Sequence, residues 1–95
     1  MYELDEQVII QVRSLARRGV LPSAILREIL PFVSLQEPDR RIHLVRYFKQ
    51  AFCLPESPMA IFGWNPDGSG ELKDADLDRL LTKRMTQTLP KWNVA

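Results

Sequence analysis

The residues most able to do chemistry form one acidic stretch in the second half of the chain. Between residues 65 and 78 there are five carboxylates against a single base, Lys73, so the local net charge is −4. Clustered carboxylates can bind a cation, charge-match a helix N-terminus or attract a basic partner. The candidate partner-binding residues are therefore Asp67, Glu71, Asp74, Asp76 and Asp78.

One interpretation of this stretch is a calcium site, because its spacing can be aligned with the loop of an EF-hand. That loop has oxygen ligands at alternating positions and a glycine at its sharp turn. Counted from Asn65, Gly70 takes the glycine position, but Lys73 falls on a ligand position and Asp76 is shorter than the usual glutamate. The oxygens would come from Asn65, Asp67, Ser69, Glu71 and Asp76.

The other interpretation needs no metal. Residues 65–68 read Asn, Pro, Asp, Gly, the order preferred in a type I turn, and Asp74 is able to cap the helix that follows. The dipole of that helix also favours acids at its start and bases near its end. We favour the turn and the cap, we expect no cofactor, and the weak EF-hand-like module stays an alternative.

The chain shows no arrangement typical of an enzyme. His43 is the only histidine, and no nucleophile, second histidine or carboxylate pair is placed to work with it. We expect His43 to be a partly exposed structural residue. Cys53 is the only cysteine, which excludes an internal disulfide, and its apolar neighbours predict a buried thiol. The sequence thus predicts a non-enzymatic protein.

A DNA-binding helix-turn-helix is a second alternative. Residues 15–25 contain two apolar segments around Gly19, with Arg18 and Arg27 nearby. However, Arg18 and Glu28 fall where that motif needs core residues, and the formal net charge of the chain is only +1. Phosphate attraction needs a basic surface, so a nucleic acid is not the expected partner.

The apolar spacing predicts helices and no strand. Helices are expected over residues 5–18, 21–30 and 74–87, and the segment 59–64 is expected to be a short helix or an extended strip on the core. A further helix should start at Ser34 or, one turn later, at Pro38 or Asp39, and should end before Pro55. Ile42 is expected on its core face. The expected core includes Val12, Leu15, Ile25, Ile29, Val45, Phe48, Leu77 and Leu80.

Length and composition predict a single small all-α domain. A chain of 95 residues with 45% hydrophobic content supports one core, so residues 1–95 should form one domain of four to five short helices. The apolar runs are too short to span a membrane, and the acidic start over residues 1–6 differs from a signal peptide. We therefore expect a cytoplasmic protein without a membrane partner.

Two segments carry a resemblance to a known class of proteins. Residues 47–52, YFKQAF, and residues 61–77, IFGWNPDGSGELKDADL, resemble a pattern in small bacterial immunity proteins, over about residues 47–81. The resemblance implies a protein that neutralises a cognate toxin. We therefore expect a protein-binding inhibitor, an immunity protein or antitoxin whose partner is a toxin domain, and the acidic stretch is the expected binding surface.

Overall fold

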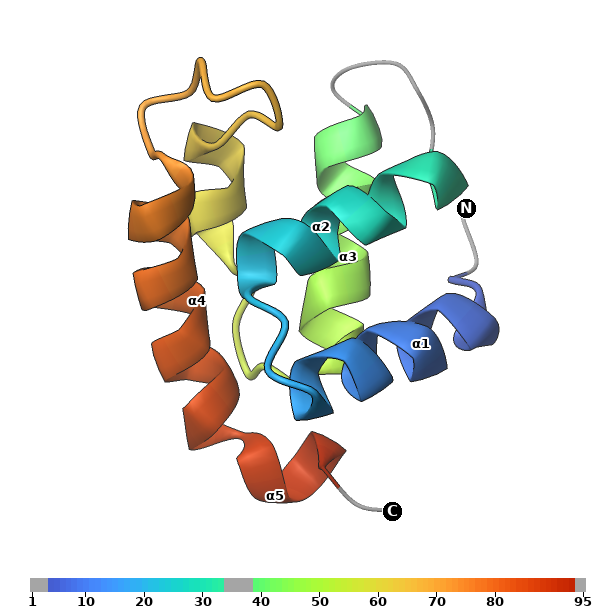
Figure 1. Cartoon of the computed structure of the whole chain (residues 1–95). Coiled ribbons are helices and arrows are strands. Elements are labelled where there is room, and N and C mark those ends of the chain that lie inside the picture. The colour runs from blue at the N-terminus through green and yellow to red at the C-terminus, as the bar shows by residue number, and fades with distance from the viewer. Residues whose placement is uncertain (1–3, 34–38, 94–95) are drawn as a thin grey trace.

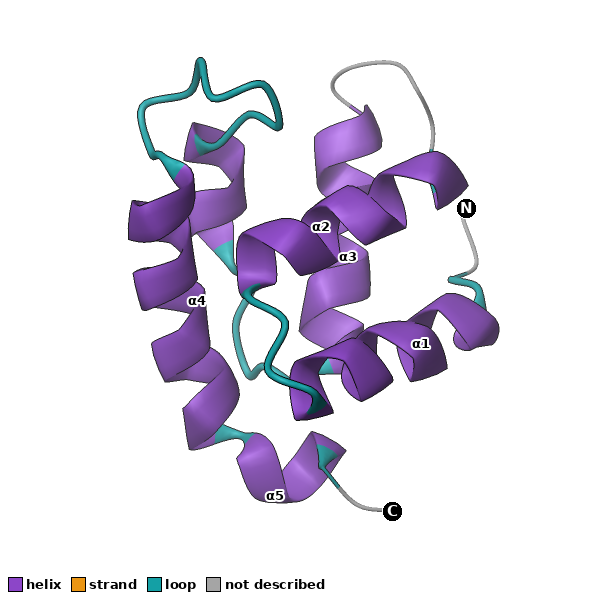
Figure 2. Cartoon of the chain, viewed as in Figure 1, coloured by secondary structure: helices purple, strands orange, loops and turns teal. Residues whose placement is uncertain are grey.

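Helices joined by loops make up the whole described structure. The computed structural model describes residues 4–33 and 39–93, and within these ranges Figure 2 shows helices and loops but no strand. The fold is all-α, as the sequence predicts. The elements are α1 (Glu6–Arg17), α2 (Pro22–Ile29), η1 (Leu30–Phe32), α3 (Asp39–Ala51), η2 (Met59–Gly63), α4 (Asp74–Gln87) and α5 (Leu89–Trp92), where η denotes a 3-10 helix.

The helix α1 has the ends that the sequence predicts. The Asp5 carboxylate accepts a hydrogen bond from the Gln7 backbone N–H at 2.9 Å, which caps the first turn. At the other end Gly19 has a φ of +87° and the Val20 N–H donates to the Leu15 carbonyl at 3.1 Å. This is a Schellman motif, in which the left-handed residue turns the chain toward α2.

The helix α3 ends with the same motif but without a glycine. The Leu54 N–H donates to the Lys49 carbonyl at 3.1 Å, and Cys53 takes the left-handed position with a φ of 52°. The Cys53 side chain is half-buried. The prediction of a buried thiol is wrong, because Cys53 lies just beyond the helix instead of on its inner face.

The helix α2 packs against three other helices. It contacts α1, α3 and α4, and in the view of Figure 1 it crosses in front of α3. Five of its eight residues are buried. The aromatic part of the core comes from Phe48, Phe52, Trp64 and Trp92, and the Phe52 ring meets the Trp92 ring edge-on with centroids 4.9 Å apart. Within the described residues, no helix is both long and apolar enough to cross a membrane.

Two of the predicted core residues are instead exposed. Leu80 is 41% exposed and Ile42 is 43% exposed. The buried stripe of α4 is Leu77, Leu81 and Met85, and Leu80 lies beside it. Of the other predicted core residues, Leu15 is partly buried and the rest are fully buried. Helical spacing therefore identified the buried face of each helix, but not which residues at the edge of that face are exposed.

The helix α3 begins at Asp39, the later of the two predicted starts. The alternative start at Ser34, like Pro38, falls outside the described residues. His43 is only 6% exposed, so the expectation of partial exposure is wrong. The segment after Pro58 is helical, one of its two predicted forms. The short helix α5 was not predicted, because Pro90 suggests the end of helical structure and in fact lies in the first turn of α5.

Candidate functional site

The candidate site is built on the loop between η2 and α4, at the upper left of Figure 1. Backbone hydrogen bonds close this loop. The Leu72 N–H donates to the Gly63 carbonyl at 2.8 Å, and Trp64 and Leu72 form an isolated parallel bridge. At its tip the Gly68 N–H donates to the Asn65 carbonyl at 3.0 Å, which is the predicted turn. The loop thus has a fixed backbone course.

Gly70 is the residue that allows the loop to close. A Cβ atom added to it would lie 2.6 Å from the Gly63 carbonyl oxygen and 2.8 Å from the Asn65 nitrogen. Both neighbours are backbone atoms, which cannot move away as the end of a side chain can. The glycine is required here because two stretches of backbone pass against each other, and its turn-forming freedom is secondary.

Asp74 joins the loop to α2 and to the core. Its carboxylate accepts two hydrogen bonds from the Arg27 guanidinium, at 2.9 and 3.0 Å, and one from the Trp64 indole at 2.9 Å. The guanidinium also donates to the Pro66 carbonyl at 2.9 Å and lies over the Trp64 ring. The hydrogen bonds from Arg27 and then from Trp64 hold the pKa of Asp74 below its usual value.

This arrangement corrects the predicted role of Asp74. Asp74 is the first residue of α4 and its carboxylate does not cap that helix, because it is turned toward Arg27 and Trp64. The capping bond comes from Asp76, which accepts the backbone N–H of Lys73 at 3.3 Å. Asp76 also lies 3.8 Å from the Arg79 guanidinium, a pair exposed to solvent and therefore weak.

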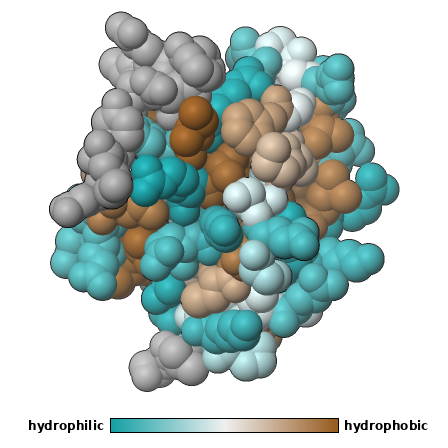
Figure 3. Space-filling view, turned by 180° about the vertical axis from the view of Figure 1, so that it is seen from behind, coloured by the Kyte–Doolittle hydropathy of each residue, from teal (hydrophilic) through white to brown (hydrophobic). Residues whose placement is uncertain are grey.

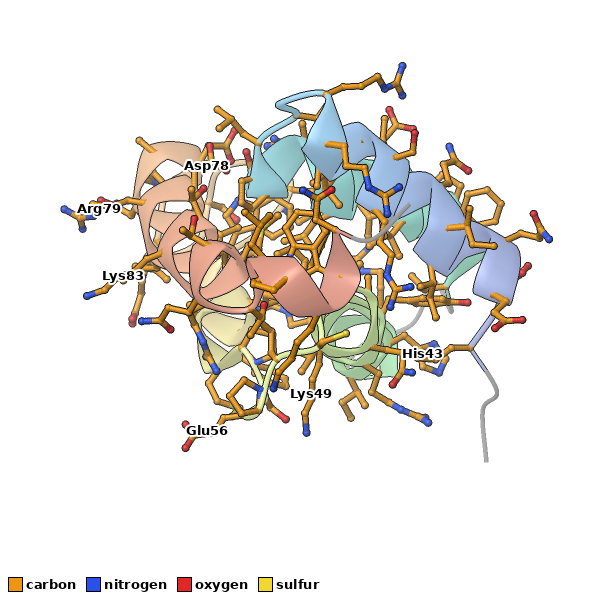
Figure 4. All side chains as sticks on the ribbon, turned by 90° about the horizontal axis from the view of Figure 1, so that it is seen from below. His43, Lys49, Glu56, Asp78, Arg79 and Lys83 are labelled. Atoms are coloured by element: carbon orange, nitrogen blue, oxygen red, sulfur yellow. The ribbon has the colours of Figure 1, made fainter. Side chains whose placement is uncertain are left out.

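Asp78 has a structural role between two helices. It accepts hydrogen bonds from the Ser23 backbone N–H at 2.7 Å and from the Ser23 hydroxyl at 3.1 Å. The residue before α2 is Leu21, which has no side-chain oxygen, so α4 supplies the N-terminal acceptor that α2 lacks. Figure 4 shows Asp78 where these two helices meet. The Asp78 carboxylate therefore stabilises the contact between α2 and α4.

Asp67 and Glu71 remain as the exposed acids of the loop. The Asp67 carboxylate accepts the backbone N–H and the hydroxyl of Ser69, at 2.9 and 2.7 Å. These two bonds, the hydroxyl first, lower the pKa of Asp67. They also fix the direction of the side chain. Asp67 and Glu71 together are called the acidic surface below.

Three of the residues proposed as ligands in the EF-hand alternative, Asn65, Asp67 and Asp76, already accept hydrogen bonds from groups of the protein itself. The Asn65 side-chain oxygen accepts a hydrogen bond from Arg41, and its amide donates to the Ser69 hydroxyl at 3.0 Å. The Lys73 ammonium donates to the Gly68 carbonyl at 2.6 Å, so a cation of the chain already lies at the loop. Within the described part of the chain, no group of three or more His, Cys, Asp or Glu side chains could hold a metal ion. The geometry favours the turn.

The helix-turn-helix alternative places its second helix in a DNA groove, which requires that helix to be exposed. Here α2 is the most enclosed helix, with Ile25, Leu26 and Ile29 fully buried. Arg27 on its outer side is bound to Asp74. The two helices around Gly19 therefore form a helical corner that packs on the core. This geometry does not support DNA recognition by α2.

A depression lies beside the loop. It has a volume of about 500 Å³ and is lined by Arg41, Phe62, Asn65, Ser69 and Glu71 together with Gly63 and Gly70. The Phe62 side chain is 38% exposed. The Arg41 guanidinium donates to the Phe62 carbonyl at 2.6 Å, which ties α3 to the end of η2. The depression therefore combines an exposed ring, fixed polar groups and one of the two acids.

Sequence reasoning missed Arg27 and Arg41, which organise the site from α2 and α3. Neither is close to the loop in sequence, and a single arginine on a helix is usually solvated. The sequence did contain an indirect signal for the role of Asp78, because α2 begins at Pro22 after Leu21 and has no capping residue of its own. Comparison of this chain with protein families, with curated proteins and with solved structures finds no match in any of the three.

Proposed function

We propose that this protein is a non-enzymatic inhibitor of the immunity or antitoxin type, which binds and neutralises a protein toxin through the acidic surface. The observation that supports this proposal is the closed loop, whose backbone is held by its own hydrogen bonds while Asp67 and Glu71 remain exposed. A surface fixed before binding loses little conformational entropy when a partner arrives.

The chemistry of the surface fits a basic partner. Toxic enzymes that act on nucleic acids need a basic cleft for phosphates, and an acidic surface would speed encounter and compete for that cleft. Phe62 supplies an exposed aromatic ring in the same depression as Glu71, and aromatic residues are enriched where protein interfaces have their strongest contacts. The acids would set the association rate, and the ring would slow dissociation.

The test requires the protein encoded beside this gene, with its toxic C-terminal domain purified as the probe. The variant Asp67→Asn/Glu71→Gln removes both charges of the acidic surface and spares Asp74 and Asp78, which support the fold. We expect its association rate with the toxin domain to fall about tenfold at low salt and to lose most of its salt dependence.

The matched control is Glu6→Gln/Glu28→Gln, which changes the net charge equally at two exposed positions on α1 and α2. It should bind and protect cells as the parent does. If the parent neither binds the toxin domain nor protects cells from it, the inhibitor proposal fails. If the acidic-surface variant binds as fast as the parent, the interface lies elsewhere on the molecule.

A further inference from the structure

A second concave surface lies between η2 and α4 and shares no lining residue with the depression beside Phe62. This groove has a volume of about 440 Å³. Its apolar part comes from Leu54, Ala60, Leu80 and Leu81, and Leu80 is 41% exposed. Viewed from behind, apolar side chains gather over the part of the surface where η2 lies (Figure 3). Leu54 and Leu81 are also buried in the core, so Leu80 and the half-buried Ala60 supply the exposed apolar area of the groove.

The groove has a length suited to a helix. Along α4 it extends from Leu80 to Gln87, which at 1.5 Å per residue is about 10 Å, or two helical turns. Peptide helices that bind in grooves insert apolar side chains spaced three or four residues apart, so two turns provide two or three such contacts. A two-turn apolar strip matches that requirement.

The wall opposite α4 is held in place. The Arg84 guanidinium donates to the Glu56 carbonyl at 2.9 Å and to the Ser57 carbonyl at 3.4 Å, which binds the segment after α3 to α4. Thr88 adds a hydrogen bond from its hydroxyl to the Phe52 carbonyl at 2.6 Å. Because these bonds cross from α4 to the opposite wall, the groove is formed before any partner binds.

The charges on the groove favour an acidic occupant. Lys83 is exposed, and it projects outward from α4 in Figure 4. From residue 79 to the end, the chain contains four bases and no acidic side chain. The opposite wall carries one acid, Glu56, and two bases, Lys83 and Arg84, line the α4 side, so the groove itself has a net charge of +1.

We propose that this groove binds a short amphipathic helix of a partner protein, with its apolar side against Leu80 and Ala60 and acidic residues along the edge that meets Lys83. The apolar contacts hold the helix, and the charges select acidic over basic sequences. This surface is separate from the acidic surface, so either proposal can fail without the other.

The test uses two synthetic peptides that share one leucine face and form helices. One carries glutamates along its edges and the other carries lysines. We expect the acidic peptide to bind the full-length protein about tenfold more tightly at low salt. In backbone NMR spectra, its binding should shift the amide signals of Ala60, Leu80 and Lys83 and leave those of Asp67 and Glu71 unchanged.

Three variants test the assignment. Leu80→Gln should weaken both peptides, and Lys83→Glu should remove the preference for the acidic one. The control Ile10→Gln removes an apolar side chain on α1 that is 55% exposed, somewhat more than Leu80, and should change neither affinity. All three positions are exposed, so thermal melting should show the parent fold in each variant.

Several results would overturn the proposal. Equal affinity for the two peptides, stronger binding of the basic one, absence of binding, or shifts mapped outside the groove would each do so. Sedimentation of the protein alone provides a further check. If the parent forms a dimer that Leu80→Gln dissociates, the occupant of the groove is a second copy of this chain and the proposed helix partner is wrong.

Discussion

The two tryptophans of the chain are both buried, but their indole N–H groups have partners of different kinds. Trp64 donates to the Asp74 carboxylate at 2.9 Å, whereas Trp92 donates to the Met85 backbone carbonyl at 3.0 Å. The loop that begins at Trp64 leads into one end of α4, and α5, which contains Trp92, follows the other end (Figure 1).

This difference in the hydrogen-bond partner of the indole determines how each end of α4 responds to substitution and to pH. A backbone carbonyl is present whatever the side chain and does not titrate, so the Trp92 hydrogen bond depends neither on the side chain at position 85 nor on pH. The Asp74 carboxylate is also bound to Arg27, which in turn holds the Pro66 carbonyl. The attachment of this loop to α2 therefore depends on one ionised side chain, while its own backbone hydrogen bonds close it.

The largest expected effect is that of Trp64→Ala. Removal of this fully buried ring should lower the free energy of unfolding by about 3–5 kcal/mol, measured by chemical denaturation. It should also free the loop, so that limited proteolysis cuts between residues 64 and 73. Trp92→Ala should destabilise the protein without exposing that loop. Equal cleavage of the loop in both variants would show that the two ends are not independent.

Gly70→Ala tests the backbone closure of the loop apart from the Asp74 anchor. The new Cβ would collide with two backbone atoms, so we expect a loss of about 3 kcal/mol in denaturation experiments. The matched variant is Gly68→Ala, where the φ is +84° and no atom lies within 4 Å of the added Cβ. Strain alone should cost Gly68→Ala about 1 kcal/mol. The comparison fails if the two variants are equally stable.

Asp74→Asn tests the side-chain anchor. It removes the charge that faces Arg27, and because the Asp74 side chain is 45% exposed the loss should be only about 1 kcal/mol. In NMR spectra the Trp64 indole signal should shift while the Trp92 signal stays. Met85→Leu is the matched change at the other end and should leave both indole hydrogen bonds intact. A shift of both indole signals in Asp74→Asn would contradict local anchoring.

The smallest expected effect is a difference in pH response. The folded pKa of Asp74 is lowered, so its contribution to stability is present above the unfolded pKa of about 4 and is lost as the pH falls through the folded value. The Trp64 indole signal should move in that acidic range and the Trp92 signal should not. In Asp74→Asn the fall of stability with acid should be shallower, with a remainder from Asp67, whose pKa is also lowered.

The sequence by itself determined the features that local interactions control. Helical spacing of apolar residues located α1, α2 and α4, the positive φ of Gly19 ended α1, and the order Asn, Pro, Asp, Gly produced the turn at residues 65–68. Each of these depends on residues within a few positions of one another, so a single stretch of sequence contains the required information.

Only the tertiary structure decided which acids stay exposed and which are bound within the protein. Asp74 meets Arg27 from 47 positions away, and Asp78 meets Ser23 from 55 positions away. Local rules assigned Asp74 to its own helix because they could not include a guanidinium from α2. The exposure of Leu80 also depends on the tertiary structure. The packing of neighbouring segments decides which residues at the edge of a buried helix face are covered. Contacts with distant segments occupy Asp74 and Asp78, whereas Asp76 is bound to its near neighbours Lys73 and Arg79. Asp67 and Glu71 remain as the exposed pair.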